Sequence, residues 1–121
     1  LEDMEDVSEA LHNWSRVVRP GGFIIVTIPD EDLYEMGHWP SRRNSAHKWT
    51  FTIAKVKSWS PRSINVIDLV MEFYDRLELE RLVLQRDFYR DDLRQREFDQ
   101  TRTPVAECAI EVIWRKRVAD E

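Results

Sequence analysis

An unbroken apolar run at residues 23–28, Phe-Ile-Ile-Val-Thr-Ile, constrains the fold of this chain more than any other feature. The turn sequence Arg-Pro-Gly-Gly at residues 19–22 precedes the run, and Pro29 ends it. Because the run is apolar at both alternating positions and rich in β-branched residues, it predicts a strand that is covered on both faces. Strands of this kind lie inside α/β sheets, so the pattern predicts an α/β fold.

The segment before the turn predicts an amphipathic helix. Asp6 and Glu9 have the spacing of a capping box, which marks the start of a helix. Pro20 and Gly21 match the central positions of a type II turn, where glycine accepts a positive φ without strain. The apolar residues between cap and turn recur at helical spacing: Val7, Ala10, Leu11, Trp14, Val17 and Val18.

The rest of the chain is less regular. Residues 30–60 have no clear period and predict a long loop with one short helical turn at 31–36, and a loop of this length is usually functional or disordered. Ser60 followed by Pro61 is a helix-start signal, so a buried helix is predicted over residues 61–73.

Three segments complete the chain. Residues 77–85 fit either a strand with a bulge near Arg81 or a helix, and periodicity alone leaves both open. Residues 86–103 are dense in charge and predict a flexible connector. Residues 106–115 alternate between apolar and polar positions and predict a strand.

This order of elements resembles the C-terminal half of a class I S-adenosylmethionine-dependent methyltransferase of the type 11-like group. In that family a helix and a "(K/R)PGG" turn precede the fifth strand, as residues 14–23 do here. Residues 1–7, Leu-Glu-Asp-Met-Glu-Asp-Val, resemble the segment after the fourth strand, often "LEH(V/L)xD", with Asp3 in place of the common histidine.

The resemblance implies one partial domain over residues 1–121 with a partial Rossmann-like fold of about three strands and two main helices. The family inserts its last strand antiparallel beside the fifth, in the order 5-7-6. For this chain the predicted order is 23–28, then 106–115, then 77–85. Strand 23–28 would then be an edge with unpaired backbone groups, so we expect a homodimer or a swapped assembly through it.

The resemblance also implies S-adenosylmethionine as the cofactor of the full-length enzyme. The family holds it with a Gly-rich loop and an acidic residue that would precede Leu1, and the three glycines of this chain form no such loop. We therefore expect this segment to be inactive alone and to bind no cofactor tightly. Glu2 matches a position near the methionine end of the cofactor, although a solvated carboxylate is the simpler interpretation. The sequence identifies no catalytic residue.

A basic aromatic loop follows the apolar run. No Asp or Glu occurs between Met36 and Ile67, whereas six Lys or Arg residues do. Guanidinium groups bind phosphate or carboxylate, and aromatic faces stack on sugars or bases. Because related methyltransferases build part of their acceptor pocket here, we expect an anionic acceptor such as a nucleotide-linked or phosphorylated sugar. The candidate contacts are Asp30, Trp39, Arg42, Arg43, His47, Lys48 and Trp49.

A simpler interpretation of this loop stays open. Trp49, Phe51 and Ile53 alternate and could enter the core while the cations are merely solvated. Asp30 after a proline is also an ordinary turn or cap residue. The alternative function is a small, non-catalytic, self-associating α+β module that binds an anionic ligand or a protein through residues 36–67.

Composition excludes several other classes. The single cysteine, Cys108, allows no internal disulfide, and His38 and His47 lack an adjacent carboxylate or third ligand, so no metal is expected. No apolar stretch reaches the ~20 residues that span a bilayer, and the acidic start lacks the basic region of a signal peptide, so we expect a cytoplasmic protein. The net charge of −5 argues against nucleic-acid binding.

Overall fold

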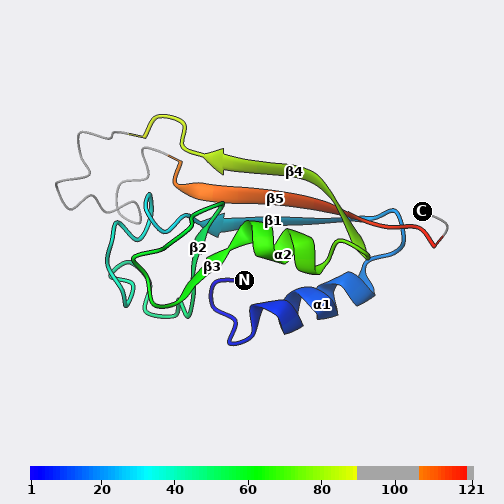
Figure 1. Cartoon of the computed structure of the whole chain (residues 1–121), viewed down its shortest axis with the longest axis horizontal. Coiled ribbons are helices and arrows are strands. Elements are labelled where there is room, and N and C mark those ends of the chain that lie inside the picture. The colour runs from blue at the N-terminus through cyan, green and yellow to red at the C-terminus, as the bar shows by residue number, and fades with distance from the viewer. Residues whose placement is uncertain (90–106, 120–121) are drawn as a thin grey trace.

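The computed structural model describes residues 1–89 and 107–119. It is an α/β structure in which both helices lie on the same side of a three-stranded sheet (Figure 1). Residues 90–103 of the predicted connector lie outside the described residues. Ala106, the first residue of the predicted last strand, also lies outside them. In chain order the elements are α1 (Val7–Val17), β1 (Phe23–Pro29), β2 (Thr50–Thr52), β3 (Ser63–Asn65), α2 (Val66–Glu72), β4 (Leu77–Gln85) and β5 (Ala109–Lys116).

The predicted first helix and turn are confirmed. The side chain of Asp6 accepts a hydrogen bond from the Glu9 backbone N–H at 3.0 Å and caps α1. After the helix, the N–H of Gly22 donates to the carbonyl of Arg19 at 2.9 Å, and Gly21 between them has a φ of +82°. This is the left-handed conformation that the third residue of a type II turn needs.

The main sheet has the order β1-β5-β4, and β5 runs antiparallel to both neighbours. Segment 77–85 is a strand, and its register shifts between Leu79 and Arg81, where the slipped apolar phase predicted a bulge. The predicted strand order is therefore confirmed. The parallel strands β1 and β4 are joined by a crossover that contains α2, as parallel strands require.

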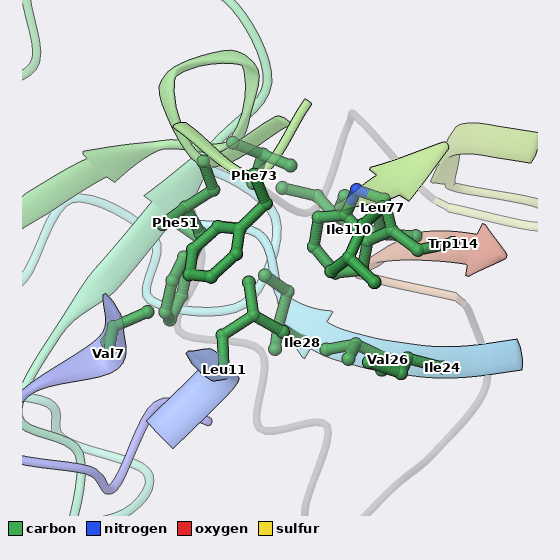
Figure 2. Close-up of a cluster of buried hydrophobic side chains, with 13 residues drawn as sticks. Val7, Leu11, Ile24, Val26, Ile28, Phe51, Phe73, Leu77, Ile110 and Trp114 are labelled. Atoms are coloured by element: carbon green, nitrogen blue, oxygen red, sulfur yellow. The ribbon is translucent and has the colours of Figure 1, made fainter. Parts of the chain in front are cut away.

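The core lies between this sheet and the two helices. Alternate residues of β1 and β5 point into it, and Trp114, Ile110 and Phe73 are at most 1% exposed. Figure 2 shows Leu11 of α1 beside Ile28 of β1 in this cluster. Full burial of each large apolar side chain contributes about 1.5–3 kcal/mol, so this single layer of contacts supplies most of the fold's stability.

The prediction that the apolar run is covered on both faces is wrong for the described chain. Ile24, Val26 and Ile28 are buried, whereas Phe23 and Ile25 are 56% and 65% exposed. The reason is that α1 and α2 both pack on one face of the sheet. Among the described strands, only β5 pairs with β1 over residues 23–29. The predicted free edge of β1 is therefore present in the described part of the chain.

Residues 30–60 are more ordered than the prediction of one long loop. β2 pairs in parallel with β3, and a single bridge joins Asp30 to Phe51 next to the end of β1. The predicted helical turn at 31–36 is a hydrogen-bonded turn, in which the Tyr34 N–H donates to the Asp30 carbonyl at 2.9 Å.

The predicted start of the second helix at Pro61 is wrong. Residues 63–65 pair with β2, so they cannot be helical, and α2 begins at Val66. The side chain of Asn65 caps it by accepting from the Ile67 N–H at 3.0 Å. Ser60 does act as a cap, but of the turn before β3, because its hydroxyl accepts from the Arg62 N–H at 3.1 Å.

Neither of the two described helices has the length and apolar content that crossing a membrane requires.

Candidate functional site

A pocket of about 320 Å³ opens at the carboxyl end of β1. This is the end of a sheet strand at which α/β proteins usually bind ligands. Three parts of the chain that are distant in sequence meet there: the segment before α1, the loop after β1, and the start of β5. The lining residues are Glu2, Thr27, Ile28, Pro29, Tyr34, Asn44, His47, Cys108 and Ala109.

A buried carboxylate orients the histidine of this pocket. Nδ1 of His47 lies 2.6 Å from Oε1 of Glu35, and the two side chains are only 3% and 1% exposed. When Glu35 is ionised its oxygen can only accept, so Nδ1 carries the hydrogen. In the neutral imidazole Nε2 then carries the lone pair, and among the described residues it has no hydrogen-bond partner. The Tyr34 ring packs against the imidazole with centroids 5.5 Å apart.

The segment before α1 is fixed against the same loop. The backbone N–H groups of Lys48 and Trp49 both donate to the carbonyl of Glu2, at 2.8 and 3.3 Å. The indole N–H of Trp49 donates to the carbonyl of Glu5 at 3.1 Å, and the Lys48 ammonium pairs with the Glu5 carboxylate at 3.1 Å. The two hydrogen bonds to the Glu2 carbonyl bring Glu2 and His47, two residues singled out in the sequence, to one pocket.

Glu31 holds the loop in this arrangement. It is fully buried, and its two oxygens accept hydrogen bonds of 2.8–2.9 Å from Thr50, Lys55, Ser58 and Ser63. Burial alone raises the pKa of Glu31, but these hydrogen bonds outweigh burial, and its pKa lies below the ordinary 4.5. Burial likewise lowers the pKa of Lys55, yet its bonds to Asp32 and Glu31 raise that pKa overall.

Asp30 takes the role of a cap. Its side chain accepts from the backbone N–H groups of Asp32 and Leu33 at 2.9 and 3.0 Å. Burial raises the pKa of this carboxyl more than the two hydrogen bonds lower it. Asp30 is not in the lining of the pocket that contains His47, so its proposed contact with substrate stays a prediction.

The other predicted substrate contacts lie outside this pocket. Trp39, Arg42 and Arg43 are not in its lining, and Arg43 contacts the sulfur of Met36 at 3.9 Å. Lys48 and Trp49 instead attach the loop to the N-terminal segment, as described above. Whether any of these residues touches a substrate stays a prediction.

The cations of the loop make internal contacts. The Arg62 guanidinium lies 3.8 Å from the centroid of the Trp49 ring, and its Nε donates to the Lys48 carbonyl. Phe51 is fully buried, and Trp49 and Ile53 pack against the core. The simpler interpretation of these three apolar residues is confirmed, but Lys48, Lys55 and Arg62 are paired rather than merely solvated.

Glu35 was not singled out from the sequence, and neither was the role of Glu31 in holding the loop. One signal could have indicated them: an acidic cluster at residues 30–35 directly precedes the acid-free basic stretch. Opposite charges this close along the chain can pair once the loop folds back. Cys108 is half-buried in the lining of the pocket. Burial raises the pKa of its thiol, which argues against a nucleophilic role.

In comparisons with known proteins, no family model matches this chain, and no curated protein or solved structure matches it either.

Proposed function

We propose that this chain is the C-terminal part of a class I S-adenosylmethionine-dependent methyltransferase and supplies the acceptor side of its site. One observation carries the proposal: Glu2 and His47 line the same pocket at the carboxyl end of β1. The family resemblance assigns Glu2 to the cofactor side and the loop with His47 to the acceptor side. Methyl transfer requires these two sides to meet. The family resemblance singled out Glu2, whereas the composition of its loop singled out His47.

The residues of the pocket suit the placement of an acceptor. S-adenosylmethionine, when bound, supplies an electrophilic methyl group, and we propose Glu2 as a contact for it. Nε2 of His47, held by Glu35, would accept a hydrogen bond from the acceptor hydroxyl or amine and would take its proton as the methyl group passes from the cofactor sulfur to the acceptor. Most of the rate gain comes from placing the acceptor in line and excluding water.

We further propose that the acceptor is a small anion, such as a nucleotide-linked or phosphorylated sugar. Arg42 and Arg43 are the cations of the loop that we assign to it, because guanidinium groups bind phosphate and carboxylate in a bidentate manner. We also propose a cytoplasmic location, as expected from the sequence.

A second candidate function is the non-catalytic self-associating module. The exposed Phe23 and Ile25 and the free edge of β1 favour it, because such edges pair readily with another strand. In either function we propose a second copy of the chain as the partner at this edge. The corresponding experiment is given in the Discussion.

Calorimetric titration with S-adenosylmethionine tests the methyltransferase proposal. We expect the 121-residue chain to give no saturable heat at micromolar concentrations, and the same chain extended by the segment encoded directly upstream to bind. Replacement of Glu2 by Gln in the extended chain should weaken binding by about tenfold, or 1.4 kcal/mol, because one polar contact with the cofactor is lost. Replacement of the exposed Glu5 by Gln is the matched control.

Two results would contradict the proposal. One is an extended chain that fails to bind the cofactor, and the other is equally tight binding by the 121-residue chain, which would mean that the cofactor site does not depend on a preceding segment.

A further inference from the structure

Three potential metal ligands meet beside the pocket, two of them from its lining. Carboxylate oxygens of Glu2 and Asp3 and a ring nitrogen of His47 all lie within 4.8 Å of one another. Glu2 is partly buried, Asp3 is exposed, and His47 is 7% exposed. No sequence pattern predicts this cluster, because His47 lies 44 positions after Asp3.

A second, independent observation points to a ligand. Nδ1 of His47 is bonded to the buried Glu35, so Nε2 is the nitrogen that remains for an ion. Metal-binding histidines almost always donate their other ring N–H to a carboxylate or carbonyl, which fixes the ring and makes the ligating nitrogen more basic. The Glu35–His47 pair has this arrangement before any ion binds, and Nε2 has no other partner among the described residues.

The backbone also holds the ligands in place. The carbonyl of Glu2 accepts hydrogen bonds from the N–H groups of Lys48 and Trp49. His47 directly precedes Lys48 in the chain, so these bonds keep Glu2 close to His47. Glu2 and His47 both line the pocket, which leaves room for water or an acceptor oxygen beside them. One competing contact exists, because the Leu1 ammonium lies 3.2 Å from a Glu2 oxygen.

We propose that Glu2, Asp3 and His47 form a binding site for one divalent transition metal ion, with Glu35 as the outer-sphere partner of His47. One imidazole and two carboxylates suit Mn²⁺ or Zn²⁺, whereas Mg²⁺ and Ca²⁺ prefer oxygen ligands alone. Ligands bind such ions at about 2.0–2.2 Å, and Asp3, the exposed ligand, is the one with most freedom to adjust when the ion binds. The inference does not depend on methyl transfer, since it requires only these four residues, and it is an alternative to the base role of His47, because a bound ion occupies the Nε2 lone pair.

Mn²⁺ binding measured by electron paramagnetic resonance tests the site. We expect one ion per chain at saturation. Asp3→Asn removes one ligand from an exposed position and leaves the core intact, so it should weaken Mn²⁺ affinity by at least about tenfold, as loss of even an outer-sphere partner does. Glu5→Gln removes the same charge from the same segment, outside the cluster, and should change the affinity by less than about threefold.

A second readout locates the ion. Bound Mn²⁺ should broaden the imidazole signals of His47 in nuclear magnetic resonance spectra and leave those of His12, which lies on the outer surface of α1, unchanged. The proposal would be overturned by a wild-type chain that binds neither Mn²⁺ nor Zn²⁺ below millimolar concentration. Equal losses of affinity in Asp3→Asn and Glu5→Gln would also overturn it, since they would show only nonspecific attraction to an acidic segment.

Discussion

Replacement of Glu31 by Gln is expected to lower the free energy of unfolding by about 3 kcal/mol, because four donors then face a neutral amide in a buried site. Each of these hydrogen bonds reaches a different part of the loop, between Thr50 and Ser63. A single carboxylate therefore connects β2, β3 and the turn that contains Lys55. Urea unfolding of the two proteins at neutral pH measures the difference.

The same carboxylate makes stability depend on pH. Since the folded pKa of Glu31 lies below its ordinary 4.5, its contribution is complete above that value and is lost as the pH falls through the folded pKa. The wild type should therefore lose more stability than Glu31→Gln below about pH 4.5. Parallel losses in the two proteins would contradict this assignment.

A surface glutamate provides the control for this prediction. Glu5 also pairs with a lysine, but its side chain is 77% exposed. Exposed pairs of this kind contribute about 0–1 kcal/mol, so Glu5→Gln should change stability by no more than that.

The second large effect concerns self-association. We expect the chain to form a dimer in which the free edges of two β1 strands pair, and replacement of Ile25 by Lys should raise the dissociation constant about 100-fold. Ile25 is 65% exposed and lies near the middle of β1, so a symmetric dimer brings two new positive charges close together. A lysine on an edge strand also opposes pairing by itself. Sedimentation equilibrium measures the constant.

Val17→Lys is the matched control, since Val17 is 82% exposed and belongs to α1 rather than to β1. The dimer of this variant should be as stable as that of the wild type. A wild-type chain that stays monomeric at high micromolar concentration would contradict the account, as would an Ile25→Lys dimer of unchanged affinity.

Much of the main sheet could be predicted from the sequence. Residues 23–28 and 106–115 have strong strand patterns, and the slip in apolar phase near Arg81 indicated the bulge that the structure contains. The strand order could not come from these patterns, because periodicity does not say which strands are neighbours. It came from the resemblance to methyltransferases.

The rest of the fold depends on contacts that leave little local signal. β2 and β3 are three residues long, too short for a period, and they pair only because Glu31 and the bridge from Asp30 hold them together. Because this pairing makes residues 63–65 a strand, α2 begins after the helix-start signal at Ser60-Pro61. The exposure of Phe23 could not be foreseen, since the sequence does not say which face the helices cover.

The candidate site was predicted only in part. The sequence singled out Glu2 and His47 separately, by resemblance and by loop composition. Their meeting depends on backbone hydrogen bonds from Lys48 and Trp49, which no side-chain pattern encodes. Glu35 gives His47 its orientation. The two residues are 12 positions apart, and no helix or strand contains both of them.

Both proposals for the pocket depend on the orientation of His47 by Glu35, which leaves Nε2 for an acceptor or an ion. The most direct measurement is the ¹⁵N chemical shift of each ring nitrogen of His47 in the neutral, metal-free protein. The account predicts a hydrogen on Nδ1 and a bare Nε2. A hydrogen on Nε2 with a bare Nδ1 would contradict it.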